Sequence, residues 1–300
     1  MANTPRMRHV ARVLGRTARS FYDDQLTHHA AAMTYYVLMS LFPLLLVGLS
    51  LLGLFGEYPR TYNALIGHLR HVVPATTLDT LDRSLRGALK HKGTATTALV
   101  FSALTALYGS TGALEATRRA LNVVFEAQTG RSFLRRKLID TISSIALVVL
   151  VVTSLVLVFL GGSLADEVFR SIGAAGTARD VWAFARWPAA VGIAMLIFSG
   201  IYYVTPDVRQ RGFAWITPGA AIGVVAWLGV TFAFSQYLAH FPSAGAVYGA
   251  FGAAIFLIVW LWLTNVALLF GAELDAEIER EREMAEGVPE ADTLNLPART

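Results

Sequence analysis

The sequence AAAMTYYVLMSLFPLLLVGLSLLGLFG at residues 30–56 contains no Asp, Glu, Lys or Arg. It is longer than the roughly 20 apolar residues that a helix needs to cross the hydrocarbon core of a bilayer. About thirty mostly polar residues precede it, and it is too long for the apolar core of a cleavable signal peptide, so we expect it to stay in the protein. This run predicts a first transmembrane helix.

Five further charge-free runs follow, at residues 93–114, 141–165, 187–205, 212–241 and 242–272. The chain has 300 residues, of which 55% are hydrophobic and only 15% charged, whereas a soluble domain has about 25% charged residues. A β-barrel would show alternating polarity, but residues 147–160 are apolar almost without interruption. The sequence predicts an all-α polytopic membrane protein with six transmembrane helices. The absence of cysteine excludes disulfides and thiolate chemistry.

The distribution of Lys and Arg predicts the orientation of these helices. With the N terminus in the cytoplasm, sixteen of the 25 basic residues lie in cytoplasmic segments and nine lie outside. We therefore expect both termini to be cytoplasmic. In this scheme residues 1–29 form a basic cytoplasmic segment and residues 30–276 form the membrane domain.

The first external loop, residues 57–92, has a pattern of its own. Leucines recur every three or four residues with charged residues between them, at Leu78, Leu81, Leu85 and Leu89. This spacing is typical of an amphipathic helix. Such a helix would either lie in the outer headgroup layer or cap the helix bundle.

Seven acidic residues crowd into the segment after the sixth run. They are Glu273, Asp275, Glu277, Glu279, Glu281, Glu283 and Glu286. We expect the sixth helix to continue into solvent until Gly287-Val288-Pro289 stops it. Residues 277–300 would then form an acidic, partly disordered cytoplasmic tail, which is a candidate binding site for a protein partner.

Polar residues three or four positions apart give the second helix one polar face. They are Tyr108, Thr111, Gly112, Glu115, Arg119 and Asn122. Ionisable groups inside a bilayer usually face a bundle interior or a wet cavity. Glu115 is alternatively explained as a boundary residue that pairs with Arg119.

Two other helices add residues to this candidate polar cavity. Tyr36 and Ser40 share a face of the first helix, and Asn265 is a carboxamide deep in the sixth run. Asn265 has the simpler alternative of a hydrogen bond to a neighbouring helix. The full candidate set is Tyr35, Tyr36, Ser40, Tyr108, Ser110, Glu115, Asn122 and Asn265.

Glycines and prolines form a second group of candidates. Small residues four positions apart, such as Gly219 and Gly223, allow two helices to approach closely. Pro218 either kinks the fifth helix or occupies its first turn. The same two alternatives apply to Pro43 in the first helix. The candidate hinge or packing residues are Pro43, Gly109, Gly112, Pro218, Gly219, Gly223, Gly249 and Gly252, and packing is the favoured interpretation.

Three common enzyme signatures, GxxxxGKS/T, HExxH and GxSxG, do not occur in the sequence. We therefore predict no enzyme activity, no metal and no cofactor. The basic segments at residues 6–19 and 131–137 lie beside apolar runs, so they predict contacts with anionic lipid head groups and not with nucleic acid. The sequence leaves open whether the protein forms a homo-oligomer.

Five segments, in order along the chain, resemble the YihY/BrkB family of bacterial inner-membrane proteins, which older descriptions label ribonuclease BN. They are HAAAMTYY with SLFP at residues 29–43, YGSTGAL with ALN at 108–122, Trp215 with PGA at 218–220, YGAFGA at 248–253 and GAELDA at 271–276. The resemblance covers about residues 15–280. It implies a six-helix protein of the bacterial plasma (inner) membrane with cytoplasmic termini, and it supplies no catalytic residues.

These patterns predict a transporter or exporter, or a lipid-translocating protein. The alternative is a non-transporting factor for envelope biogenesis or assembly. A ribonuclease is a remote third possibility, because the chain lacks a soluble metal-binding nuclease domain.

Overall fold

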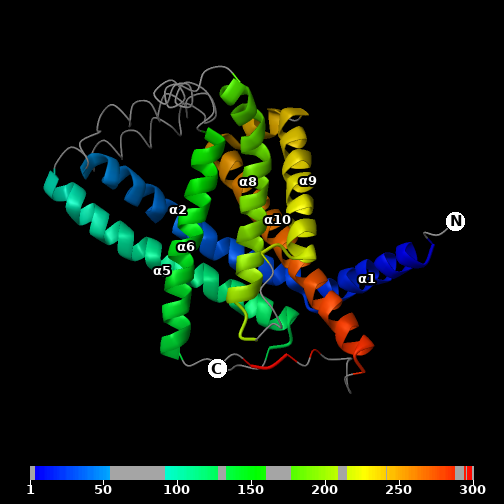
Figure 1. The fold of residues 1–300 in the computed structure, drawn as a ribbon. Helices are drawn as coiled ribbons and strands as arrows, with labels where there is room; N and C mark the ends of the chain where they lie inside the picture. Colours follow the sequence, from blue (N-terminus) through cyan, green and yellow to red (C-terminus); the bar gives the residue numbers. More distant parts are fainter. Residues whose placement is uncertain are drawn as a thin grey trace. The chain divides into compact units, whose positions relative to one another are not determined.

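The computed structural model describes residues 4–54, 92–127, 133–159, 177–208, 215–240, 242–287, 294 and 296–298. These residues form long helices (Figure 1). They contain no β-strand, only an isolated bridge between Val208 and Ala298. The prediction of an all-α fold is therefore confirmed for the described part of the chain.

The described helices are α1 (Thr4–Asp23), α2 (Leu26–Leu54), α5 (Lys92–Val124), α6 (Phe133–Phe159), α8 (Thr177–Val204), α9 (Pro218–His240) and α10 (Pro242–Ala285). Each of the six charge-free runs overlaps one helix from α2 to α10. Within the described residues, α8, α9 and α10 are long and apolar enough to cross a membrane. Six spans with cytoplasmic termini stay a prediction, and the amphipathic helix expected within residues 57–92 lies outside the described ranges.

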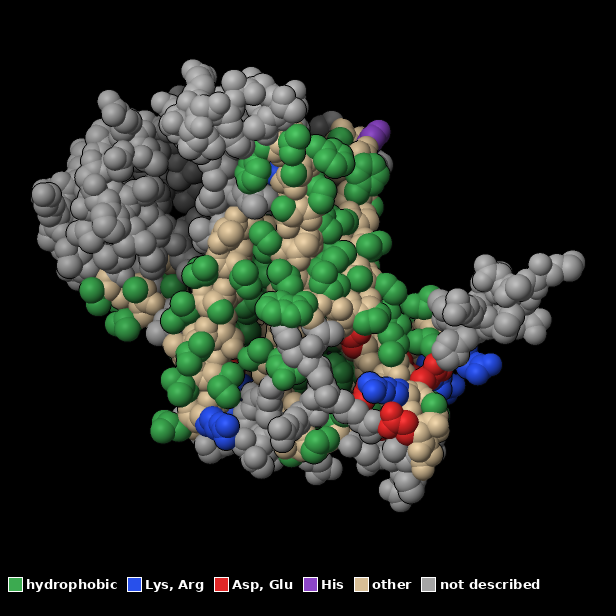
Figure 2. All heavy atoms as spheres, viewed as in Figure 1, with side chains coloured by type: hydrophobic (Ala, Val, Ile, Leu, Met, Phe, Trp, Pro, Cys, Tyr) green, Lys and Arg blue, Asp and Glu red, His purple; other side chains and the backbone are tan. Residues whose placement is uncertain are grey.

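The chain divides into two compact units. The first contains residues 1–30, 117–229 and 266–300, and the second contains residues 31–116 and 230–265. In the first unit, hydrophobic side chains cover the visible faces of α6 and α8 (Figure 2), and Leu138, Ile145 and Phe184 are exposed. An apolar surface of this extent is typical of a face that meets lipid.

Glycines bring α9 and α10 into close contact in the first unit. A Cβ atom on Gly219 would collide with the carbonyl oxygen of Gly271, and one on Gly223 would lie 3.2 Å from the carbonyl oxygen of Ala267. Beside this contact, the Tyr202 hydroxyl of α8 donates a hydrogen bond of 2.6 Å to the carbonyl oxygen of Leu268. Gly219 and Gly223 therefore lie in a close helix contact.

Pro218 is the first residue of α9, where a proline loses no helical hydrogen bond. The Thr217 hydroxyl accepts a hydrogen bond of 3.0 Å from the backbone N–H of Ala220, as an N-cap residue does. Asp275 of α10 accepts a second one of 2.7 Å from the N–H of Gly219. The structure thus supports the first-turn alternative for Pro218, with a carboxylate at the positive end of the helix dipole.

We expect Gly219→Ala to destabilise the protein by about 1–3 kcal/mol, because the added methyl group overpacks the contact with Gly271. Gly192→Ala on α8 is the matched control, since nothing lies within 4 Å of its added Cβ atom. This control should be neutral or stabilising by up to about 1 kcal/mol, because alanine favours a helix. Thermal unfolding of both purified variants in detergent measures the difference, and equal stability would refute the packing role.

Candidate functional site

A buried arginine joins three segments of the first unit. The Nη1 atom of Arg118 on α5 lies 2.5 Å from Oδ2 of Asp140 on α6. Its Nε atom lies 3.8 Å from Oδ2 of Asp207, which follows α8. All three side chains are buried. They form an ionic triad in which one guanidinium faces two carboxylates.

Asn122, one turn further along α5, positions Asp207 in this triad. Its Nδ2 atom donates a hydrogen bond of 3.0 Å to the Asp207 carboxylate. Its Oδ1 atom accepts one of 2.8 Å from the Asp207 backbone N–H. This reciprocal pair fixes the orientation of the amide and holds the segment after α8 against α5.

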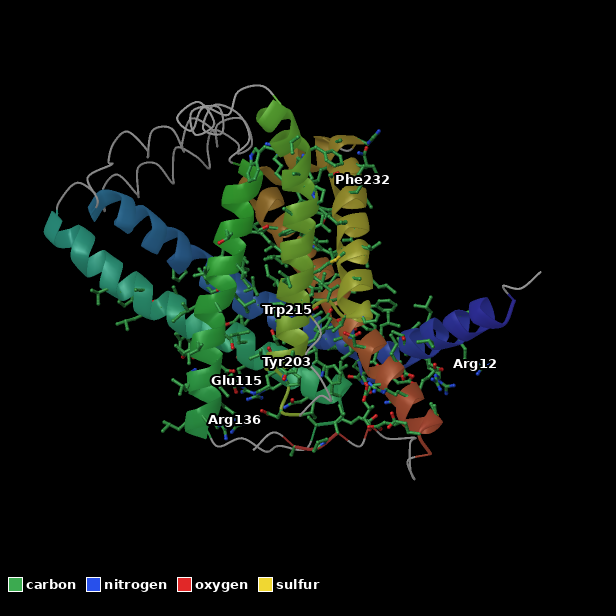
Figure 3. All side chains as sticks on the ribbon, in the orientation of Figure 1. Arg12, Glu115, Arg136, Tyr203, Trp215 and Phe232 are labelled. Atoms are coloured by element: carbon green, nitrogen blue, oxygen red, sulfur yellow. The ribbon has the colours of Figure 1, made fainter. Side chains whose placement is uncertain are left out.

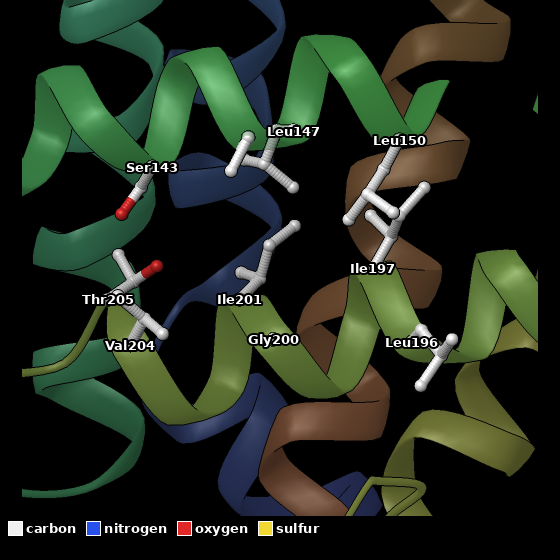
Figure 4. Close-up of a pocket in the computed structure, with 10 residues that line it drawn as sticks. Ser143, Leu147, Leu150, Leu196, Ile197, Gly200, Ile201, Val204 and Thr205 are labelled. Atoms are coloured by element: carbon white, nitrogen blue, oxygen red, sulfur yellow. The ribbon is translucent and has the colours of Figure 1, made fainter. Parts of the chain in front are cut away.

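A groove of about 110 Å³ lies between α6 and α8 (Figure 4). Its lining is mostly apolar and consists of Ser143, Ala146, Leu147, Leu150, Leu196, Ile197, Gly200, Ile201, Val204 and Thr205. The hydroxyls of Ser143 and Thr205 lie together at one end of this lining in Figure 4. One end of the groove is therefore polar, and the rest of its lining is apolar.

The polar end of the groove is adjacent to the ionic triad along the chain. Ser143 lies one helical turn after Asp140 on α6, and Thr205 lies two residues before Asp207. Arg118 contacts both aspartates and thus links the two walls of the groove at this end. The apolar lining of the groove thus ends beside two hydroxyls, with the buried charges of the triad nearby in the chain.

The C-terminal part of α10 is helical to Ala285, as expected, and one side of it is buried while Ile278 and Arg282 are exposed. Glu273, Glu277 and Glu283 are buried. Arg16 of α1 lies 3.3 Å from Glu277 and 2.7 Å from Glu281. The expectation of a solvated helix does not hold for the three buried glutamates, and basic α1 contacts this side of α10 through Arg16.

A second set of contacts ties this acidic segment to the end of α5. Arg280 lies 2.5 Å from Glu277 and 2.6 Å from Glu126, which follows α5. Glu126 also accepts a hydrogen bond of 2.9 Å from the backbone N–H of Leu294. Charged side chains gather along this part of α10 in Figure 2. Arg12, a further basic residue of α1, is labelled in Figure 3.

Asp24, between α1 and α2, faces the same charged groups. Burial raises the pKa of its carboxyl above the ordinary value, and the negative charge of Glu126 raises it further, while Arg280 acts in the opposite direction. This electrostatic coupling to Glu126 and Arg280 makes Asp24 a member of the charged cluster at this end of the first unit.

In the second unit, several predicted site residues meet in helix packing. A Cβ atom on Gly109 would lie 2.9 Å from the Cα atom of Ser40, and one on Gly112 would lie 2.7 Å from the Tyr36 ring. The Ser40 hydroxyl donates to the carbonyl oxygen of Val37 on its own helix at 2.8 Å. These contacts join α2 to α5.

The other predicted residues are dispersed. The Asn265 amide donates a hydrogen bond of 3.0 Å to the Thr34 hydroxyl, the helix-to-helix alternative considered above. Tyr35 and Tyr108 are exposed, and Glu115 is half-buried. Pro43 lies inside α2, and Gly252 is buried in α10. Asn122 joins the triad in the first unit, and the surroundings of Ser110 and Gly249 lie outside what the structure describes.

Sequence reasoning missed the residues that form the buried ionic contacts. Asp140 and Asp207 flank the apolar runs, where charged residues are expected to be solvated, and Glu273 looked like the start of an acidic tail. The sequence did offer one signal for Glu273. Seven acidic residues and two arginines lie within fourteen residues, so burying this helix requires positive charge from elsewhere in the chain. The basic segment 6–19 supplies part of it through Arg16.

Long apolar helices with buried charges at their ends define a helical membrane protein. The family model described as "Virulence factor BrkB" matches residues 17–295, and the chain therefore belongs to this family. That assignment agrees with the resemblance found in the sequence. No solved structure matches the chain.

Several curated proteins are similar to the chain. The "Putative ribonuclease-like protein YfkH" of Bacillus subtilis is 25% identical over 260 residues, which cover 87% of this chain and 92% of the relative. A "UPF0761 membrane protein" of Pseudoalteromonas translucida is 29% identical over 262 residues, with coverages of 86% and 83%. One of Xanthomonas campestris is 27% identical over 275 residues, and the chain spans 61% of its length.

We expect Arg118→Met to destabilise the protein by about 3–5 kcal/mol, because it removes the buried guanidinium that the carboxylates of Asp140 and Asp207 share. Arg119→Met, at an exposed position of the same helix, is the control. Unfolding in detergent measures both variants. Adding Asp140→Asn and Asp207→Asn to Arg118→Met should restore part of the loss, and no restoration would contradict the electrostatic origin.

Proposed function

We propose that this protein is a transporter of the bacterial plasma membrane that moves an amphipathic, lipid-like substrate, with six transmembrane helices and both termini in the cytoplasm. The observation that supports it is the groove between α6 and α8, with its apolar lining and its two hydroxyls at one end. In this proposal the chain is not an enzyme, although one relative has a ribonuclease-like name.

The apolar part of the groove suits a hydrocarbon chain. Leu147, Leu150, Ile197 and Ile201 offer only carbon surface, and each buried methylene group contributes about 0.8 kcal/mol relative to water. Because lipid tails are themselves apolar, this surface gives little preference by itself inside a bilayer. Selectivity would come from the polar end.

The polar end favours a neutral or zwitterionic head group. Ser143 and Thr205 supply hydroxyls that donate or accept hydrogen bonds. The neighbouring triad holds charges of both signs, the guanidinium of Arg118 and the carboxylates of Asp140 and Asp207, and so suits the two charges of a zwitterionic head group. The sequence has no ATP-binding motif, so energy for active transport would come from an ion gradient or a partner.

Filling the groove should block transport. In Gly200→Leu the new side chain projects from the groove lining, and its Cβ atom has nothing within 4 Å to collide with. We expect about tenfold slower movement of a fluorescent zwitterionic phospholipid across proteoliposomes, which corresponds to roughly 1.4 kcal/mol of lost interaction. Fluorescence quenching of the outer-leaflet lipid measures the rate.

Gly192→Leu on the same helix is the matched control, because Gly192 has equal space around it and does not line the groove. It should transport like the unmodified protein. Equal rates for the two variants would contradict the role of the groove. A folded protein that moves no lipid analogue would overturn the transporter proposal in favour of the envelope-assembly alternative. Metal-dependent RNA cleavage, by a preparation free of contaminating nuclease, would overturn the proposal that the chain is not an enzyme.

A further inference from the structure

Glu273 is the first charged residue after the apolar run of α10, which ends at Ala272. Its side chain is buried, with 1% of the residue surface exposed. Its Oε2 atom is inaccessible and has no hydrogen-bond partner among the described residues. Leaving a buried polar oxygen without a partner is destabilising, and more so for a charged group, so such a group in a folded protein calls for an explanation.

Charged groups face Glu273 from each element packed around it. They are Asp24 between α1 and α2, Glu126 after α5, and Glu277 and Arg280 on α10 itself. Three of these four groups are carboxyls. Negative charge therefore dominates the surroundings of Glu273.

The nearby arginines are engaged with other carboxylates. Arg280 lies 2.5 Å from Glu277 and 2.6 Å from Glu126. Arg16 lies 3.3 Å from Glu277. Glu273 has no ion pair within 4 Å that would compensate a buried negative charge in the described part of the chain. A carboxyl in such surroundings favours the neutral form, which carries a proton.

Asp24 is a neighbour of Glu273 with access to water. It is half-buried, while Glu273 is enclosed. The two carboxyls interact electrostatically, and Asp24 also interacts with His29 at the start of α2. The charge of Asp24 therefore affects the protonation of Glu273.

We propose that Glu273 is a proton-binding site whose protonation and release accompany the transport cycle. The ligand is a proton taken from water at the α1 end of the first unit. The coupling part of this inference rests on the proposed transport function, whereas proton binding itself does not. Such a site would couple transport to a proton gradient across the membrane, which a transporter without an ATP-binding motif could use.

Infrared titration of the purified full-length protein tests proton binding directly. The unmodified protein should show the carbonyl stretch of a protonated carboxyl that persists to higher pH than an ordinary glutamate allows. Glu273→Gln should abolish the component of this signal that persists to the highest pH, whereas Glu286→Gln, at an exposed position further along the chain, should leave it in place. A component that is absent from the unmodified protein, or that survives in Glu273→Gln, would overturn the site.

Asp24→Asn gives a second test that leaves Glu273 intact. Removing a neighbouring negative charge makes deprotonation of Glu273 easier, so its titration should move to lower pH. An unchanged titration would contradict the proposed contact between the two carboxyls.

Lipid movement in proteoliposomes with an imposed pH gradient tests the coupling. The rate should respond to the gradient in the unmodified protein and lose this response in Glu273→Gln. A retained response in Glu273→Gln would overturn the coupling. A titrating Glu273 in a protein that moves no lipid would refute the proposed function while supporting the proton site.

Discussion

The buried contact of Arg118 with Asp140 and Asp207 is the interaction on which the candidate site depends. Removing three charges from water is costly, and only their close arrangement offsets that cost. Because the charges come from α5, from α6 and from the segment after α8, this requirement holds the three segments together at one end. The walls of the groove between α6 and α8 are set by the same contact.

A similar constraint acts where α1 meets the C-terminal part of α10. Arg16 and Arg280 compensate Glu277, and Glu126 connects this group to the end of α5. The result is a unit in which α6 and α8 expose apolar side chains and several charged groups are buried at one end. Burying these charged groups costs free energy because they leave water. In membrane proteins, buried ionisable groups commonly mark the path of an ion or a substrate.

The helices could be predicted from sequence because the length of an apolar run is a local property, as residues 30–56 and 187–205 illustrate. The candidate site could not, because its contacts join distant residues. Asn122 meets a partner 85 positions away, and Asn265 meets one 231 positions away. Helical spacing placed Tyr108 and Asn122 on one face, yet Tyr108 is exposed and Asn122 holds Asp207. Glu273 was expected to be solvated because nothing in the local sequence shows that Asp24 and Glu126 lie beside it.

The most direct test of the central claim is an experimental structure of the protein in a lipid nanodisc, at a resolution that shows bound lipid. We expect elongated density of a bound lipid along Leu147, Leu150 and Ile197 in the groove, with its head group beside Ser143 and Thr205. A groove that is empty or closed by side chains, while ordered lipid is visible elsewhere on the same protein, would contradict it.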